Sequence, residues 1–348
     1  MKPLFEIKPI DREFYEKRLR AWLPDKIIDI HTHVWLARHQ AAHRRKMTGV
    51  QIWPSRVAEE SPIEELLETY RLLFPDKSVT PLIFGAALSR ADDLNDGNRY
   101  VGECAAAHRL PALLWSAPDW SGAELERNII AGGFLGIKSY LTMSPSYLPE
   151  SEIRIFDFFP HHQLEVLNRR GGVMMLHIPR DGRLRDPVNL AQMLEIEERY
   201  PDIRLIIAHV GRAYCPEDIG DAFQVLAKTK KMCFDISANT NAWVFEQLIK
   251  AVGPKRILFG SDLPITRMRM RRICEKGIYV NLAPKGLYGD ISRDKHMREV
   301  EGEEAEKLTF FMYEELDAFR RAAHTAGLDA VGIKDVFYNN ARRILTKR

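Results

Sequence analysis

Eight short apolar segments alternate with longer amphipathic segments along most of this 348-residue chain. Most of the apolar segments are about four to eight residues long and rich in β-branched residues, as buried parallel strands are. The predicted strands are Ile27–Val34, Val79–Leu88, Ala112–Ser116, Phe134–Tyr140, Gly172–Ile178, Ile203–Ala208, Met232–Ser237 and Arg256–Gly260. This alternation predicts an α/β fold with a parallel sheet and right-handed crossover connections.

The segments between the predicted strands carry apolar residues at helical spacing. The predicted helices are Ile63–Leu73, Asn98–His108, Glu124–Ala131, Arg154–Arg169, Pro187–Arg199, Ile219–Thr229 and Asn241–Val252. Ser121 and Glu124 form a capping-box pattern at the start of one helix. Eight strand–helix units predict closure into a (β/α)8 TIM barrel. A doubly wound open sheet is the alternative, which the lack of a GxGxxG motif after the first strand disfavours.

Several regions exceed the minimal barrel and predict a distorted form of it. Residues 1–25 form a charged N-terminal extension that is expected to be helical, and residues 35–62 form a long loop after strand one. Residues 265–330 form a long insertion after strand eight, with a helix-like segment over Glu303–Ala326, and Lys334–Leu345 is expected to be a closing helix. Because loops that follow strands lie on the catalytic face, both long loops are expected to build the substrate pocket. The whole chain, 1–348, is expected to be a single barrel domain.

Composition restricts the function classes open to this chain. The 45% hydrophobic content supports a large buried core, and the net charge of +3 favours neither nucleic acid nor an anionic membrane as partner. We find no apolar signal-peptide core and no apolar run long enough for a transmembrane helix. The four cysteines show no CxxC pairing, so they are expected to be free thiols in a reducing cytoplasm. Cys215 is either a packing residue or a residue that lines a site.

Five polar residues end or follow the predicted strands, where a barrel places its active site. They are His31 and His33 in strand one, His177 at the end of strand five, His209 after strand six and Asp262 after strand eight. His31 and His33 are two residues apart, so their side chains point to the same face. Imidazole and carboxylate groups are ligands for Zn²⁺, Mn²⁺ or Fe²⁺. The alternative for any single histidine is a hydrogen-bonded core residue, and His209 is either a further ligand or an acid or base.

The motifs HTH in strand one, a histidine after each of strands five and six, and SDLP after strand eight resemble the amidohydrolase superfamily. The match extends from IDIHTHVW to YNNARRIL and is to the amidohydrolase-2 branch, a group of metal-dependent TIM-barrel hydrolases and decarboxylases. The resemblance implies that His31, His33, His177 and Asp262 bind one divalent metal ion, and that His209 polarises the substrate or moves protons. Zinc is the expected metal, with manganese or iron as alternatives, and no organic cofactor is expected. Many members are dimers, so a homodimer is expected.

Lys138, at the end of strand four, has two interpretations. In binuclear members of the superfamily a carbamylated lysine bridges two metals, whereas an unmodified lysine would bind substrate or pair with a carboxylate. We favour one metal and an unmodified side chain, because lysine also occurs here in the mononuclear branch that the chain resembles. Tyr140 has the same strand parity as Lys138 and is expected to reach the mouth of the barrel too.

Three arginines fall in loops on the predicted catalytic face: Arg180, Arg212 and Arg267. Guanidinium groups clamp carboxylate or phosphate bidentately, so these residues predict an anionic small-molecule substrate, such as a carboxylated aromatic compound or a sugar acid. The alternative is that they form structural ion pairs with Asp181, Asp186 or Glu217. Trp35 is expected to wall the pocket or to join the core.

The expected function is hydrolysis of a small anionic lactone, amide or sugar-acid-like compound by a metal-activated water. Asp262 would accept a proton from the water, and His209 would donate a hydrogen bond to the developing oxyanion. The same residues would suit a decarboxylase or hydratase, which is the alternative. A non-enzymatic barrel that binds a partner is disfavoured, because every metal-site position holds a competent ligand. Asp29 and Asp235 are weaker candidates, as a residue that fixes a histidine tautomer and as a buried hydrogen-bond partner.

Overall fold

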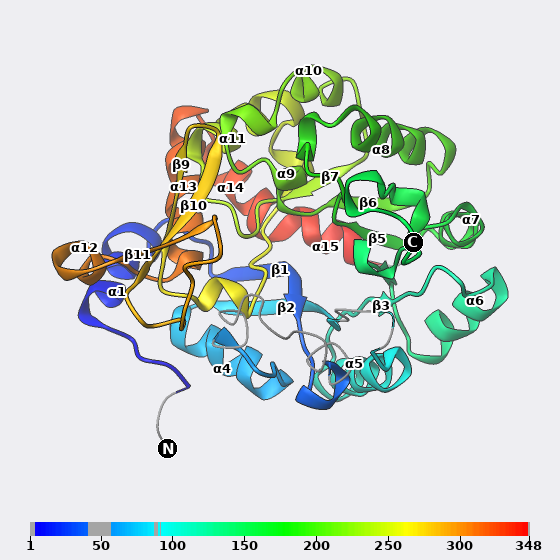
Figure 1. Cartoon of the computed structure of the whole chain (residues 1–348), viewed down its shortest axis with the longest axis horizontal. Helices are drawn as coiled ribbons and strands as arrows, with labels where there is room; N and C mark the ends of the chain where they lie inside the picture. The colour runs from blue at the N-terminus through cyan, green and yellow to red at the C-terminus, as the bar shows by residue number, and fades with distance from the viewer. Residues whose placement is uncertain (1–3, 41–56, 87–89, 91, 347–348) are drawn as a thin grey trace.

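The structure is a computed structural model that describes residues 4–40, 57–86, 90 and 92–346. Eight parallel strands lie at its centre (Figure 1). They are β1 (Lys26–His33), β2 (Ser78–Phe84), β3 (Leu114–Trp115), β4 (Gly136–Lys138), β5 (Val173–Leu176), β6 (Arg204–Ile207), β7 (Cys233–Asp235) and β8 (Ile257–Leu258). Strands β3 to β8 pair in sequence order, and β1 pairs with β2. All eight predicted strands are present, although most are shorter than expected, and residues 87–88 of the second prediction lie outside the described residues.

Backbone hydrogen bonds join these two groups of strands into a closed ring. The amide of Leu113 donates to the carbonyl oxygen of Ile83 at 3.0 Å, which joins β2 to the start of β3. At the other seam, the amide of Asp262 donates to the carbonyl oxygen of His31 at 2.8 Å, and the amide of His33 donates to that of Leu263 at 2.9 Å. The expected (β/α)8 barrel is therefore confirmed, and its closure brings the chain after β8 against His31 and His33 of β1.

Helices surround the strands, as the amphipathic segments predicted (Figure 1). They are α4 (Ile63–Leu73), α5 (Leu94–His108), α6 (Gly122–Ala131), α7 (His161–Arg169), α8 (Pro187–Arg199), α10 (Ala222–Leu226) and α11 (Ala242–Val252). The Ser121 side chain caps α6 by accepting the amide of Glu124 at 3.2 Å. The helix predicted over Arg154–Arg169 is interrupted instead: a 3-10 turn, Ile155–Asp157, precedes α7. Pro160, at the N-cap of α7, has no amide hydrogen with which to continue an earlier helix.

Both ends of the chain are helical and pack on the barrel. The N-terminal extension forms α1 (Pro9–Phe14) and a π-helical turn, Tyr15–Leu19. The closing helix consists of α14 (Ala330–Lys334), a π-helical turn and α15 (Asn340–Leu345). The ring of Phe337 in that turn stacks on Phe259 with centroids 5.2 Å apart, next to β8. The predicted closing helix is thus confirmed, and it seals the barrel beside its first and last strands.

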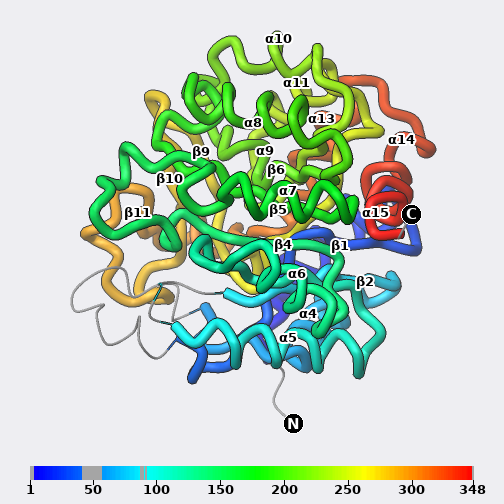
Figure 2. The backbone as a smooth tube through the Cα atoms, turned by 90° about the vertical axis from the view of Figure 1, so that its right-hand side faces the viewer, coloured from blue at the N-terminus to red at the C-terminus, as the bar shows by residue number. Residues whose placement is uncertain are grey.

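The insertion after β8 contains a small sheet that the sequence analysis missed. Strands β9 (Arg271–Glu275) and β10 (Ile278–Pro284) form an antiparallel hairpin, and β11 (Met297–Val300) pairs parallel to β10. Two helices follow, α12 (Gly302–Glu306) and α13 (Phe311–Thr325), within the predicted helical segment. The sheet lies to one side of the barrel (Figure 2). Its strands were overlooked because β9 is basic and half-exposed, so it lacks the apolar run that marked the barrel strands.

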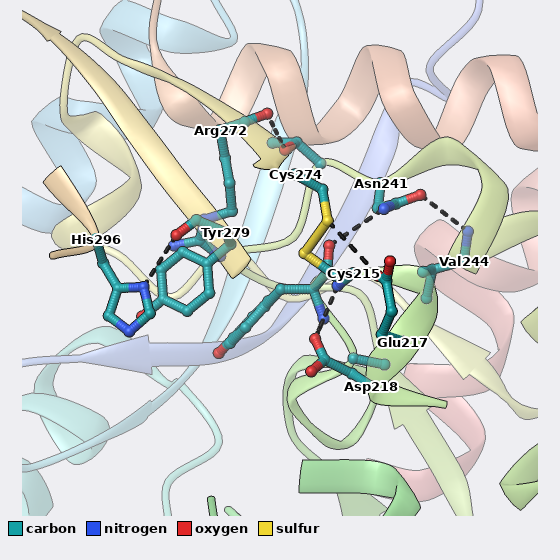
Figure 3. The surroundings of a disulfide bond; sticks show 12 residues. Cys215, Glu217, Asp218, Asn241, Val244, Arg272, Cys274, Tyr279 and His296 are labelled. Carbon is teal, nitrogen blue, oxygen red and sulfur yellow. Dashed lines mark hydrogen bonds between the residues drawn. A yellow bond between two sulfur atoms is a disulfide. The ribbon is translucent and has the colours of Figure 1, made fainter. Parts of the chain in front are cut away.

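Cys215 and Cys274 form a disulfide that links the segment after β6 to β9 (Figure 3). The expectation of four free thiols is therefore wrong for these two cysteines, whereas Cys104 and Cys233 are free and buried. The two partners are 59 residues apart, and only the folded chain brings their Cα atoms to 5.7 Å, within the range of a disulfide. Within the described residues, no helix combines the length and the apolar composition that a membrane span requires.

A buried ion pair fastens the N-terminal extension to the insertion. The guanidinium of Arg269 donates to both carboxylate oxygens of Asp11, at 2.8 and 2.6 Å. The hydroxyl of Thr309 donates to the same carboxylate at 2.6 Å. Asp11 is fully buried and Arg269 is 6% exposed, so water can replace neither partner.

We expect Arg269→Met to lower the free energy of unfolding by about 3 to 5 kcal/mol, because it leaves the Asp11 carboxylate buried without a counter-charge. Urea unfolding followed by circular dichroism would measure the loss. The control is Arg298→Met, whose exposed pair with Glu275 should change stability by less than about 1 kcal/mol. Equal losses in the two variants would contradict this role for the Arg269–Asp11 pair.

Candidate metal centre

The polar residues predicted from the strand ends gather at one mouth of the barrel. Each lies at or just after the carboxyl end of its strand, the face on which barrel enzymes hold their active sites. They are His31 and His33 at the end of β1, Lys138 at the end of β4, His177 after β5, His209 after β6 and Asp262 after β8. Asp235, at the end of β7, completes the set.

His31 and His33 both turn their Nε2 atoms toward Asp262. The Nδ1–H of His31 donates to Asp235 at 2.9 Å, and the Nδ1–H of His33 donates to the carbonyl oxygen of Gly85 at 3.0 Å. Since both partners accept, each imidazole carries its proton on Nδ1 and keeps a lone pair on Nε2. These two Nε2 atoms lie 3.5 and 3.3 Å from the same oxygen of Asp262. Two nitrogen lone pairs and a carboxylate oxygen therefore face one another.

Two features hold Asp262 in this position: a strained backbone angle and the close packing of the preceding chain against β1. Its φ angle is +59°, in the left-handed region that residues with a side chain seldom adopt. Two residues earlier, a Cβ on Gly260 would lie 2.8 Å from the Cβ of His31, so only glycine lets the chain pass this close to β1. Burial raises the pKa of Asp262, but its interactions with His33, His209 and His31 outweigh it and lower the pKa below its usual range. The carboxyl group is therefore ionised at neutral pH.

Asp235 is the fully buried acceptor that organises the other histidines. Besides His31, it accepts the backbone amide of His209 at 2.8 Å and the amide and hydroxyl of Ser237. Burial raises the pKa of Asp235, but the interactions with His31, His209 and Ser237 reverse the shift and lower the pKa to about 2. Asp235, rather than Asp29, thus fixes the tautomer of His31. Asp29 instead accepts the His31 amide at 3.1 Å.

His209 presents an acceptor to the mouth. Its Nδ1 lies 3.1 Å from the carbonyl oxygen of Ser237, which places the proton on Nδ1 and leaves a lone pair on Nε2. Burial lowers the pKa of His209 to about 4, so the ring is neutral near pH 7. The expected donation of a hydrogen bond from His209 to an oxyanion does not suit this tautomer. A role as proton acceptor does.

A left-handed turn carries His209 and Arg212. His209, Val210, Gly211 and Arg212 have φ angles of +55°, +51°, +62° and +59°. Each non-glycine residue in this region costs about 1–2 kcal/mol, and such strain concentrates at functional sites. Gly211 also avoids a clash, because a Cβ there would lie 2.5 Å from the side chain of Leu184. The turn aims His209 into the mouth at the expense of local backbone energy.

His177 lies on the far side of His209 from β1. Its ring centroid is 5.3 Å from that of His209 and 4.7 Å from that of Tyr140. Its Nδ1 is buried and has no hydrogen-bond partner within the described part of the chain. Burial, followed by the charge of Arg212, lowers the pKa of His177 well below its usual value, so the imidazole is neutral. An unsatisfied buried nitrogen of this kind is suited to a metal ligand.

The donor set fits a divalent cation. Ligand atoms of His31, His33 and Asp262 all lie within 4.8 Å of one another, and two neutral nitrogens and an ionised carboxylate are what Zn²⁺ or Mn²⁺ prefers. A second trio, His31, His209 and Asp235, is as compact. Its Asp235–His31 contact is already an Nδ1–H hydrogen bond, so we assign the metal to the Nε2 side. His177 lies outside both trios, and its ligand role stays a prediction.

Lys138 is 2% exposed. Its Nζ lies 5.7 Å from the ring centroid of Phe84 and 6.0 Å from that of Tyr140, and no carboxylate among the described residues pairs with it. Burial lowers the pKa of Lys138 to about 8. Both an unmodified ammonium and a carbamylated amine are compatible with these surroundings.

The three arginines expected to bind substrate are engaged by the protein. Arg180 pairs with Asp186 at 3.2 Å, and Arg212 donates to the carbonyl oxygen of Pro179 at 2.8 Å. Arg267 donates to Glu65 at 3.2 Å and to the carbonyl oxygen of Val57 at 2.8 Å. For Arg180, and for Arg212 with Asp181 at 3.7 Å, the structure matches the ion-pair alternative. Substrate contact by the three arginines stays a prediction.

Trp35 is 7% exposed, and its indole donates to the carbonyl oxygen of Glu59 at 3.3 Å. The sequence analysis missed Ser237, whose hydroxyl lies 2.9 Å from Nδ1 of His209. The strand parity that Ser237 shares with Asp235 could have indicated it. Residues 41–56 of the long loop expected to build the pocket lie outside the described residues.

The neutral state of His209 predicts a loss of stability in acid. The unfolded histidine has a pKa of about 6.5, whereas the folded one has a pKa of about 4. Between these values the unfolded chain binds more protons. Stability is therefore full above about pH 6.5 and falls by up to about 3 kcal/mol as the pH drops toward 4. Urea unfolding of metal-free protein at several pH values would measure the slope, and His209→Gln should make it shallower. An unchanged slope would contradict the assignment.

Both the sequence and the fold of this chain are similar to those of known proteins. The sequence matches the amidohydrolase family model over residues 28–347, while a search of curated proteins finds no significant match. A solved 2,6-dihydroxybenzoate decarboxylase in complex with 2,6-dihydroxybenzoate aligns with a TM-score of 0.58 and 13% identity, covering 92% of this chain and 99% of the other.

Two further solved structures show the same fold. A dihydroxybenzoic acid decarboxylase from a Polaromonas species, with bound manganese and 2-nitroresorcinol, aligns with a TM-score of 0.55 and 14% identity, covering 92% and 97% of the two chains. A Pseudomonas putida protein assigned as a 2-pyrone-4,6-dicarboxylic acid hydrolase aligns with a TM-score of 0.52 and 14% identity, covering 93% and 98%. These identities establish a shared fold, and the family match establishes more: the chain is a member of the amidohydrolase family.

Proposed function

We propose that this enzyme is a metal-dependent hydrolase of a small anionic compound, such as a lactone, an amide or a sugar-acid-like molecule. One observation carries the proposal: the side chains next to the metal position are proton acceptors. Asp262 is an ionised carboxylate, and His209 is a neutral imidazole with its proton held on Nδ1 by the Ser237 carbonyl. Hydrolysis needs acceptors for the proton of an attacking water.

We assign the metal to His31, His33, His177 and Asp262 and expect one zinc ion. Such a cation lowers the pKa of bound water from about 15.7 toward about 7. Manganese is the main alternative metal, since a protein of the same fold has been solved with it. The buried Nδ1 of His177 supports its inclusion, because coordination would satisfy that atom.

In this scheme each residue has a distinct task. Asp262 accepts the proton of the attacking water and passes it to the leaving group. His209 orients the water through its Nε2 lone pair. Lys138, a buried cation without a carboxylate partner among the described residues, takes over the stabilisation of the developing oxyanion that the sequence analysis gave to His209.

Decarboxylation is the second candidate. It requires delivery of a proton to carbon, and Lys138 is the protonated side chain of this mouth that could supply one. Two of the similar structures are named as decarboxylases of dihydroxybenzoates. We rank it second because the groups beside the metal position, Asp262 and His209, are both deprotonated toward the mouth.

Other expectations from the sequence remain predictions. They are the homodimer, the cytoplasmic location, the single-domain organisation and the contacts of Trp35, Tyr140 and the three arginines with substrate. The disulfide between Cys215 and Cys274 removes one argument for the cytoplasm, which was the expectation that all the cysteines are free.

We expect His177→Ala to reduce bound metal from about one ion per chain to well under half and to abolish activity, with the fold retained. Elemental mass spectrometry and circular dichroism would measure both. The control is His161→Ala on α7, where His161 contacts the hydroxyl of Tyr200 at 2.8 Å, and this variant should keep its metal. Full metal content in His177→Ala would refute the ligand assignment, and two ions per chain in the wild type would favour a carbamylated Lys138.

Products separate the two candidate reactions. A panel of lactones and carboxylated phenols, assayed with the metal-loaded enzyme, should give acid release without CO₂. Asp262→Asn should lower kcat by at least about 100-fold, since it removes both a ligand and the proton acceptor. Stoichiometric CO₂ release from a carboxylated phenol, with no turnover of any lactone or amide, would instead establish the lyase.

A further inference from the structure

A cavity of about 250 Å³ lies between the segments after β6 and β7, strand β9 and helix α13. The lining residues that matter here are Tyr214, Asn241, Trp243, Arg272, Cys274 and Arg321. Two arginines and two aromatic residues line this space, and its described lining contains no carboxylate. The cavity is therefore positively charged and flanked by flat apolar surfaces.

Arg272 is the charged residue of this cavity that has no counter-ion. Its guanidinium lies 4.5 Å from the ring centroids of both Tyr214 and Tyr279. Its Nε donates to Asn281 at 2.8 Å and its Nη1 donates to the carbonyl oxygen of Ala238. Within the described ranges, Nη2 makes no hydrogen bond and no carboxylate pairs with the group. A partly buried guanidinium without a counter-ion is stabilised most by an anion that hydrogen-bonds to its unoccupied Nη2.

The surroundings hold Arg272 in place before any ligand arrives. Cys274, two residues along β9, is bonded to Cys215, the neighbour of Tyr214 (Figure 3). The side chain of Asn241 donates to the carbonyl oxygen of Tyr214 at 3.2 Å. The disulfide and the stacked rings therefore fix both the arginine and the tyrosine under it. A preorganised group loses little conformational entropy on binding.

The position of Arg272 connects the cavity to the reaction site. Its Nη1 acceptor, Ala238, directly follows Ser237, which contacts His209. A small molecule could thus place an anionic group at Arg272 while its reactive part reaches the metal centre.

We propose that this cavity binds the carboxylate of a small aromatic or cyclic acid, with Arg272 as the main contact and Arg321 as a second one. Arg321 contributes less, because it also pairs with Asp317 at 3.3 Å. Trp243, 48% exposed, offers its indole face to the ring of the ligand. The identity of this ligand as the substrate rests on the proposed function. The preference of the cavity for an aromatic carboxylate is independent of that function.

The test compares benzoate with its neutral analogue benzamide, using full-length protein as purified and after metal removal. Tryptophan fluorescence and ligand-observed NMR would follow binding. We expect benzoate to bind at least about tenfold tighter than benzamide in both preparations, and Arg272→Met to reduce that ratio to near one. Arg271→Met is the matched control, because this exposed neighbour on β9 pairs with Glu314 outside the cavity, and it should keep the preference.

Several outcomes would overturn the proposal. They are equal binding of the two compounds, a preference that disappears with the metal, or a preference that survives Arg272→Met. If Arg272→Met does not fold by circular dichroism, Arg321→Gln decides instead, with an expected loss of several-fold in benzoate affinity and no change for benzamide. If the purified enzyme binds benzoate but holds no metal and turns over no substrate, the proposed function is refuted and the cavity assignment stands.

Discussion

The geometry of the mouth depends on the hydrogen bonds that the buried carboxylate of Asp235 accepts. It accepts from the His31 ring, the His209 backbone and two groups of Ser237, so it joins the ends of β1, β6 and β7. A buried charge is tolerated only when it is fully hydrogen-bonded, and four donors meet that condition here. Because the carboxylate fixes the His31 proton on Nδ1, it also creates the Nε2 lone pair that a metal would use.

Carboxyl groups around the mouth differ in protonation because they differ in partners. Asp235 and Asp262 face histidines and stay ionised. Burial raises the pKa of Asp29 to about 6, against hydrogen bonds from Ser261, Tyr70 and the His31 amide. Burial also raises the pKa of Glu315 on α13 well above its usual value, where it accepts the Ala238 amide at 2.7 Å. Negative charge is thus concentrated where a cation would sit, while burial disfavours a charge on Glu315.

The arginines of the barrel loops and the arginine of the insertion have different partners. The three arginines that follow barrel strands support loops: Arg180 pairs with Asp186, Arg212 holds the segment after β5, and Arg267 holds α4 and the end of the long loop. Arg272, from the added sheet, differs from them, because within the described residues its Nη2 makes no hydrogen bond. The insertion therefore adds a cation that the minimal barrel does not provide, and the disulfide fastens its strand to the segment after β6.

The sequence alone determined the barrel and the chemical identity of its mouth. Strand–helix alternation and the strand-end positions of His31, His33, His177, His209 and Asp262 follow from local periodicity, which survives folding because each element buries its own apolar face. The tertiary structure decided the rest. It set the tautomers, the neutral state of His209, the pairing of Cys215 with Cys274 and the choice among the arginines. Most of these depend on contacts between residues 26 to 206 positions apart, whose distances no local pattern encodes.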